Sequence, residues 1–217
     1  MGTPDYTSPE WSHSALLVVD VQLDFLEGGA SPIPGTREAL GAMVETVGAF
    51  RRAGRPIVHV VRLYEPGGSD VDLPRRALVE SGAAIVAPGS PGSRIPDELL
   101  VGPVELDPEL LLAGEPQPVG EDEIVLFKPR WSAFHRTPLE AWLHAREVST
   151  VVVAGCNLPN CPRASLFDAS ERDFRTVLVT DAVSQTTPER LDDLARIGVN
   201  LLSSSEVADA LSSSAPV

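Results

Sequence analysis

Short, continuous apolar runs recur along the chain and are separated by longer stretches of mixed polarity. A run without internal polar positions is typical of a strand buried on both faces, because a strand with one face in water alternates apolar and polar residues. Strands are therefore expected at residues 15–19, 56–63, 124–127, 150–154, 176–180 and 199–202.

The stretches between these runs have helical periodicity. In the first of them, apolar positions follow the spacing of one helix face from Thr36 to Ala53, and Gly54 is placed to end that helix. Thr137 and Glu140 have the spacing of a capping box, with Pro138 in the first turn. Further helices are expected at residues 74–81, 137–146, 161–172, 188–197 and 205–211, and the tail 212–217 is expected to be disordered.

Strands that alternate with helices predict a parallel sheet with right-handed crossovers and helices on both faces. The expected fold class is therefore α/β, as a single domain over residues 1–217 with its core at about 15–211. Residues 65–122 interrupt the alternation because they are rich in proline and glycine. A loop region of this length is usually functional, so a lid or a pocket wall is expected there.

The composition of the chain limits the classes of partner and the cellular compartment that can be expected. The net charge of −14 argues against a partner bound through a phosphate backbone. No apolar run approaches the roughly 20 residues that span a bilayer, and residues 1–14 lack the pattern of a signal peptide. Two cysteines in 217 residues do not suggest a disulfide framework. We therefore expect a cytoplasmic protein with a small-molecule substrate and without nucleic-acid or membrane partners.

Reactive residues follow three of the expected strands. Asp20 ends the first strand, Lys128 ends the third, and Cys161 follows the fourth after a turn. Because the carboxyl ends of parallel strands meet at one edge of a sheet, a carboxylate, an ammonium and a thiol are expected to converge there. Each has a structural alternative: Asp20 could cap a loop, Lys128 could be solvated, and Cys161 could be a small buried residue.

The position of Cys161 indicates a nucleophile. Pro162 fits the first turn of a helix, which places Cys161 at the helix N-terminus, where unpaired amides and the helix dipole favour negative charge. That setting lowers the pKa of a thiol and predicts a resting thiolate, with Lys128 beside it and Asp20 moving protons.

Four segments resemble, in order, the motifs of the isochorismatase-like cysteine hydrolases, which include nicotinamidases, N-carbamoylsarcosine amidohydrolases and streptothricin hydrolases. Residues 17–25 resemble their opening D-x-Q-x-D-F signature, and residues 128–134 resemble their lysine motif. Residues 155–161 resemble their nucleophile turn, and residues 181–184 the segment after the fifth strand. The resemblance covers about residues 15–205 and implies a three-layer sandwich around a mostly parallel six-stranded sheet in the order 3-2-1-4-5-6.

The resemblance also implies how the site works. Asp20, Lys128 and Cys161 would form a catalytic triad with a covalent, thioester-like intermediate. A cis peptide bond would join Cys156 to Asn157, and the backbone amides of Asn157 and Cys161 would form the oxyanion hole. Residues 157–160 depart from the threonine-containing turn usual in the family, which alters the pocket wall. Because family members commonly pair, a homo-oligomer, either a dimer or a tetramer, is expected.

Histidine spacing argues against a metal. Nicotinamidases of this family carry an Asp-x-His pair and a further His after the second strand, whereas here His59 has no second histidine before His135. The four histidines make no zinc spacing. No metal and no cofactor are therefore expected, nicotinamidase activity is disfavoured, and His59 is interpreted as a packed strand residue.

Five residues near the expected strand ends are candidates for substrate binding: Phe25, Arg62, Tyr64, Trp131 and Phe134. Arg62 could bind a substrate carboxylate or carbonyl through two hydrogen bonds, or it could form a salt bridge with one of the many acidic residues. Cys156 lies inside the apolar turn and is expected to be buried and inert.

The predicted function is hydrolysis of a C–N bond in a small amide, carbamoyl or lactam substrate by a Cys161 thiolate. A small neutral or acidic amide is favoured because Arg62 and Lys128 make the immediate site positive. Three alternatives remain open: isochorismatase-type vinyl-ether hydrolysis, lactam opening as in streptothricin hydrolases, and a non-catalytic binding module that retains the fold.

Overall fold

A seven-stranded sheet forms the centre of the computed structural model, which describes residues 5–68 and 70–214. The strand order is β3-β4-β2-β1-β5-β6-β7, and every neighbouring pair is parallel except β3 and β4, which are antiparallel. The strands are β1 (Ser14–Val19), β2 (Ile57–Val61), β3 (Gln117–Gly120), β4 (Glu123–Phe127), β5 (Thr150–Gly155), β6 (Arg175–Val183) and β7 (Asn200–Leu202).

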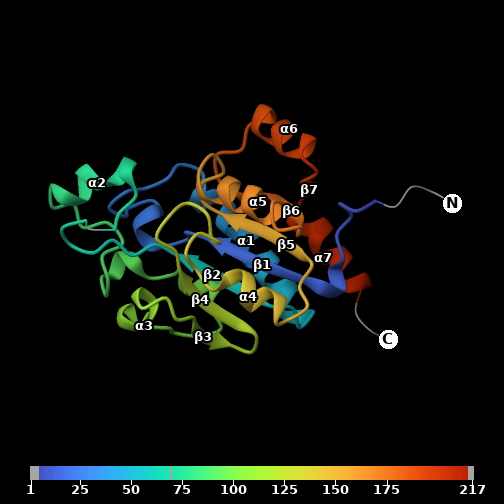
Figure 1. Ribbon diagram of the computed structural model, residues 1–217, viewed down its shortest axis with the longest axis horizontal. Helices are drawn as coiled ribbons and strands as arrows, with labels where there is room; N and C mark the ends of the chain where they lie inside the picture. The colour runs from blue at the N-terminus through green and yellow to red at the C-terminus, as the bar shows by residue number, and fades with distance from the viewer. Residues whose placement is uncertain (1–4, 69, 215–217) are drawn as a thin grey trace.

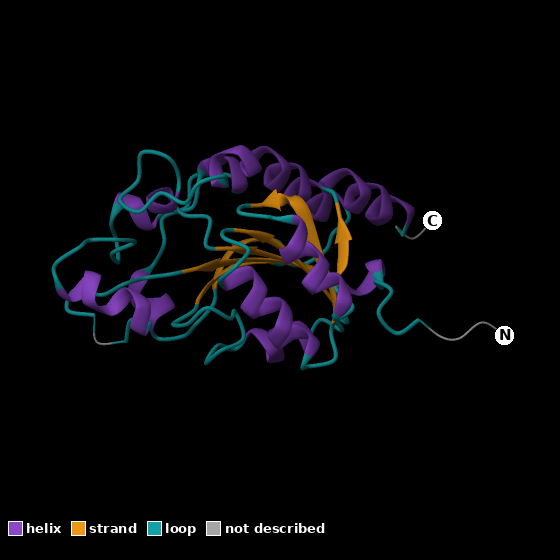
Figure 2. Cartoon of the chain, turned by 90° about the horizontal axis from the view of Figure 1, so that it is seen from above, coloured by secondary structure: helices purple, strands orange, loops and turns teal. Residues whose placement is uncertain are grey.

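Helices cover both faces of this sheet (Figure 1 and Figure 2). They are α1 (Thr36–Arg52), α2 (Leu73–Glu80), α3 (Pro108–Leu112), α4 (Leu139–His144), α5 (Cys161–Ser170), α6 (Pro188–Arg196) and α7 (Ser204–Ser213). Four short 3₁₀ turns accompany them at Trp11–His13, Leu23–Phe25, Pro91–Ser93 and Asp97–Leu99. None of the helices in the described ranges is long and apolar enough to cross a membrane.

Two apolar cores lie on opposite faces of the sheet. On one face, α1 and α7 pack together and contribute Met43, Phe50 and Leu211. On the other face, α4 and α5 contribute Leu143 and Leu166. The central strands β1 and β5 are buried along their whole length, which is why their sequences are continuous apolar runs.

The expected fold is confirmed, with one added strand. Each of the six predicted strands is present, and their order matches the order 3-2-1-4-5-6 once β3 is set aside. Strand β3 was not predicted, because Pro118 lacks an N–H and Gly120 weakens a strand, and this combination is typical of a loop. The strand also carries an irregularity in register between these two residues.

Two local predictions at helix ends are wrong. Pro138, and not Thr137, takes the N-cap position of α4; the Thr137 hydroxyl donates to the Ala133 carbonyl and accepts from the Leu139 N–H over 3.4 Å, so the expected capping box with Glu140 is not formed. The last helix extends through Ser213, so residues 212–213 are helical where disorder was expected, and residues 215–217 lie outside the described chain.

The segment between β2 and β4 lies partly against the edge of the sheet where β1 and β5 end. It contains α2 and α3 and ends in β3, so it is less irregular than its composition suggested. Figure 1 shows α2 beyond one end of the sheet, away from α7. Side chains of this segment, among them Val71, Val79 and Val86, form a small apolar cluster with Phe25 and Cys156.

Candidate active site

Asp20 and Lys128 form a buried ion pair where their strands end. Asp20 follows β1 and Lys128 follows β4, and β2 lies between those two parallel strands. The Lys128 Nζ donates to Asp20 Oδ2 over 2.8 Å and to the Arg130 carbonyl over 3.2 Å. Lys128 is 0% exposed and Asp20 is 4% exposed. Because both charges are removed from water, each depends on the other for compensation.

The turn from β5 to α5 is held close against β1. Gly155 has φ +119°, and a Cβ at this position would lie 2.1 Å from the Val19 carbonyl oxygen. The N–H of Cys156 donates to that same oxygen over 2.8 Å. The peptide bond between Cys156 and Asn157 is cis, as the resemblance implied. Further along, the Asn157 Nδ2 donates to Gln185 Oε1 over 2.8 Å.

Cys161 is the first residue of α5 and lines a small cavity with Asp20. Burial and, next in size, the Asp20 carboxylate raise the pKa of the Cys161 thiol to about 11, because Lys128 and Arg62 only partly oppose these two effects. The resting thiol is therefore protonated at neutral pH. The expectation of a resting thiolate is wrong, because burial and the nearby carboxylate outweigh the helix N-terminus and the lysine.

Hydrogen-bonding capacity is left free around the Cys161 thiol. The Oδ1 atom of Asp20 is buried without a partner among the described residues. Within the same ranges, no backbone hydrogen bond uses the N–H of Asn157 or of Cys161 as donor. Residues with free donors and a free acceptor thus line the same cavity as the thiol, which is an arrangement suited to acyl transfer.

A polar network forms the opposite wall of the cavity. Arg62 donates to Asp72 Oδ1 and to the Tyr64 hydroxyl, and the same hydroxyl lies 3.2 Å from Asp72 Oδ1. The Trp131 Nε1 lies 3.4 Å from Asp72 Oδ2. The backbone of Arg62 is fixed by Gln22, whose side chain both donates to and accepts from it. The side chains facing Cys161 are therefore held in place by one another.

The cavity is small in this structure, with a volume of about 30 Å³. Arg75 of α2 lines it. In α2 only Val79 is buried, while Leu73 and Leu78 are exposed.

Four of the five predicted pocket residues line this cavity: Phe25, Arg62, Tyr64 and Trp131. Phe134 does not, which corrects the sequence analysis. Its ring lies 5.9 Å from that of Phe174, in the core between α4, α5 and the sheet. The turn before α4 directs Phe134 inward, because an aromatic ring there buries more apolar surface than it would at the cavity.

Asp72 and Arg75, which were not predicted from the sequence, also line the cavity. Asp72 precedes a helix that carries proline in its first turn, which is the signal of a helix start. Nothing in the spacing of the sequence indicated that its carboxylate pairs with Arg62, because that contact depends on how the segment folds back onto the sheet.

Cys156 and His59 have the structural roles expected of them. Cys156 is buried and its thiol donates to the Asp20 carbonyl over 3.0 Å, and burial raises its pKa well above the usual value. His59 is buried and its Nε2 lies 2.7 Å from Glu123 Oε1. Burial raises the pKa of Glu123, but hydrogen bonds from Arg51 and His59 outweigh it and lower the pKa to about 2.

Comparison with known proteins identifies the family. The isochorismatase domain matches residues 14–200. The chain belongs to the isochorismatase family. It is 33% identical over 196 residues to a probable inactive nicotinamidase of Arabidopsis thaliana, covering 87% of this chain and 91% of that protein. It is 30% identical over 194 residues to the ureidoacrylate amidohydrolase RutB of Methylobacterium radiotolerans, covering 81% of this chain and 69% of that protein.

The fold agrees with the same family. A crystal structure of an isochorismatase family protein from Desulfovibrio vulgaris superposes with a TM-score of 0.78 at 30% identity, covering 92% of this chain and 98% of that chain. The family predicted from four ordered motifs is therefore confirmed, and a hydrolase of C–N bonds stands among its named relatives.

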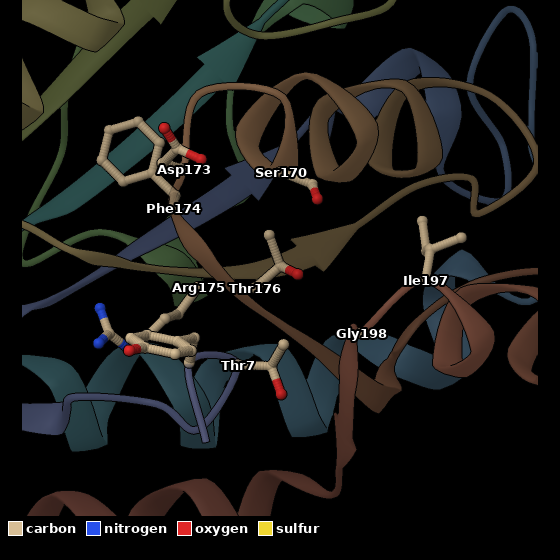
Figure 3. Close-up of a pocket in the computed structure, with 9 residues that line it drawn as sticks. Thr7, Ser170, Asp173, Phe174, Arg175, Thr176, Ile197 and Gly198 are labelled. Carbon is tan, nitrogen blue, oxygen red and sulfur yellow. The ribbon is translucent and has the colours of Figure 1, made fainter. Parts of the chain in front are cut away.

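One hollow of this isochorismatase-family protein shares no lining residue with the cavity of the cysteine. Figure 3 shows this hollow of about 390 Å³, which is lined by Thr7, Asp173, Phe174, Arg175 and Ile197 among others. It lies at the amino ends of the parallel strands, opposite the edge that carries Asp20. Its lining has neither a thiol nor a lysine. Within the described ranges, no group of three or more His, Cys, Asp or Glu side chains is arranged to hold a metal ion.

Proposed function

We propose that this protein hydrolyses a C–N bond of a small amide or carbamoyl compound, with Cys161 as the nucleophile. The observation that carries the proposal is the buried Lys128–Asp20 pair beside the Cys161 thiol, in a cavity with free backbone donors. The amidohydrolase among the relatives supports the same bond type.

In the first half of the reaction, Asp20 acts as the base. It accepts the proton of the Cys161 thiol while the sulfur attacks the substrate carbonyl carbon, forming a C–S bond. The C–N bond then breaks, and the leaving nitrogen takes the proton from Asp20. The products of this half are an amine or ammonia and a thioester on Cys161.

In the second half, water cleaves the thioester. Asp20 accepts a proton from the attacking water, the C–S bond breaks, and the proton passes to the departing sulfur, which restores the thiol and leaves a carboxylic or carbamic acid. Lys128 compensates the charge of Asp20 throughout, since its ammonium has no exposure to water. Asp20 and Lys128 therefore act on protons and charge, whereas only Cys161 bonds to the substrate.

The oxyanion of each tetrahedral intermediate needs donors that are in place beforehand. The N–H groups of Asn157 and Cys161 are suited to this role because they have no protein acceptor among the described residues and lie at the turn next to the thiol. Phe25, Arg62, Tyr64 and Trp131 would then hold the remainder of the substrate, since they line the same cavity.

The test is turnover of a panel of small amides, carbamoyl compounds and lactams, followed by ammonia release and by mass change. Cys161→Ala should lower turnover by at least about 10³-fold, because no other group can form the covalent bond. Ammonia release would indicate an amide or carbamoyl substrate, whereas addition of water without ammonia would indicate ring opening.

Two outcomes would contradict the proposal. Wild-type rates in Cys161→Ala would exclude the thiol mechanism. Inertness of the wild-type protein on the whole panel would exclude hydrolysis of these classes and favour the non-catalytic binding module.

Both cysteines are free thiols in this structure, which supports a reducing, cytoplasmic setting for the enzyme.

A further inference from the structure

The wall that faces Cys161 contains a second buried ion pair, Arg62 with Asp72. Arg62 is 2% exposed and Asp72 is 5% exposed. Both Asp72 oxygens are engaged, Oδ1 by Arg62 and Tyr64 and Oδ2 by the Trp131 indole. The guanidinium also lies 5.1 Å from the centre of the Tyr64 ring. The pair is therefore a fixed part of the cavity wall.

Two carboxylates and two guanidinium groups line the cavity. Asp20 and Asp72 are negative, and Arg62 and Arg75 are positive. Arg62 is committed to Asp72, and Arg75 donates through Nη1 to the Ser31 hydroxyl over 3.0 Å. Lys128, behind the cavity, compensates Asp20. Arg62 and Lys128 thus each have a carboxylate partner, whereas the half-buried Arg75 has a hydroxyl partner and no carboxylate among the described residues.

One donor of the pair is still available. The Nη1 of Arg62 is buried and has no partner among the described residues, while Nε and Nη2 are used by Tyr64 and Asp72. A neutral carbonyl that reached Nη1 could accept from it without disturbing the pair. A carboxylate at the same place would lie beside the carboxylate of Asp72, in a site where little water screens the repulsion.

We propose that Asp72 is a specificity-determining residue: by neutralising Arg62 it makes the cavity select amides whose remaining groups are uncharged and exclude those that carry a carboxylate. This rests on the proposed function and narrows its substrate class from neutral or acidic amides to neutral ones. The selection works by repulsion: the Asp72 carboxylate lies next to Arg62, which would bind the substrate, and it repels a substrate carboxylate.

The test uses two substrates with the same scissile amide and the same length, succinamide and succinamate, which differ by one charge. The wild-type protein should prefer succinamide by at least tenfold in kcat/KM. Asp72→Asn should lower that preference by at least tenfold, chiefly through a lower KM for succinamate. Asp72→Glu keeps the negative charge, so its preference for succinamide should stay within about threefold of that of the wild-type protein.

Asp70→Asn is the matched control. Asp70 is an exposed carboxylate two residues away that pairs with Arg130 and Arg136 and does not line the cavity. The preference of the Asp70→Asn variant for succinamide over succinamate should stay within twofold of that of the wild-type protein. An equal change in Asp70→Asn and Asp72→Asn would overturn the proposal, and so would a wild-type preference for succinamate.

Binding to Cys161→Ala, measured by calorimetry, separates this proposal from the proposed function. Tighter binding of succinamide than of succinamate supports the selection by Asp72 even where turnover fails, and it does not require a soluble Asp72 variant. Tighter binding of succinamate, or binding of neither compound, overturns it. Absence of turnover by the wild-type protein counts against the hydrolase mechanism alone.

Discussion

Replacing Asp20 by Asn should make the Cys161 thiol more acidic and, at the same time, abolish turnover. Burial is the largest cause of the raised pKa of about 11, and the Asp20 carboxylate is the next. Asn removes that negative charge and leaves Lys128 and Arg62 as the nearby charges, both of which favour a thiolate. Turnover fails because the base is gone.

The size of the effect follows from the pKa. At pH 8, a thiol with a pKa near 11 is ionised in about one molecule in 10³, and each unit by which the pKa falls raises that share tenfold. A charge a few ångströms away, at the effective dielectric typical of protein sites, contributes about 2–4 kcal/mol, or about 1.5–3 pKa units. Part of this is offset by rearrangement around the unpaired Lys128, so we expect alkylation about 10- to 100-fold faster at pH 8.

The assay is alkylation by iodoacetamide between pH 6 and pH 10, with the labelled peptides separated by mass spectrometry. The alkylation rate of Cys161 should rise with pH. The pH midpoint of that rise should be lower in Asp20→Asn than in wild type, and higher in Lys128→Met. Cys156 is the internal control, because its buried thiol should label slowly in every variant. Slower labelling of Cys161 in Asp20→Asn than in wild type at every pH would refute the electrostatic reasoning.

Four further predictions concern stability and assembly. Gly155→Ala should destabilise the fold by at least about 2 kcal/mol in urea unfolding, because φ +119° and the facing carbonyl leave no room for a Cβ; unchanged stability would contradict this. Glu123→Gln should cost about 2–3 kcal/mol at pH 7. The lowered pKa contributes stability that is present above pH 4.5 and lost as the pH falls toward 2, so the difference from wild type should shrink at pH 3. Phe134→Ala should cost about 3–5 kcal/mol, whereas Trp131→Ala, at a side chain of 40% exposure, should cost under about 1 kcal/mol and lower activity instead. Light scattering should give two or four times 23.1 kDa, and a monomer mass would exclude the expected homo-oligomer.

The sheet and the positions of Asp20, Lys128 and Cys161 were predictable from local sequence and one topological rule. Runs such as residues 151–154 have no polar position, so they could only be strands covered on both faces. Residues that directly follow parallel strands must lie at one edge, whatever the details of packing. The family resemblance added the strand order and the cis bond.

The rest depended on contacts that the sequence pattern does not encode. The pair between Arg62 and Asp72 forms because a proline- and glycine-rich segment folds back onto the sheet. The direction of the Phe134 side chain is decided by a turn whose hydrogen bonds involve Thr137 and Ala133. The state of the Cys161 thiol depends on the sum of burial and several charges, of which only the helix end and the lysine were visible beforehand.

Strand β3, which was not predicted from the sequence, also limits how the sheet could pair with another chain. Both outer strands are short, four residues in β3 and three in β7, and β3 carries Pro118 and an irregular register. Such a border offers few aligned amide and carbonyl groups to another chain, so it protects against sheet extension and fibre growth. In an assembly of this protein, copies are therefore expected to contact one another through helices and loops, and their sheets are not expected to pair edge to edge.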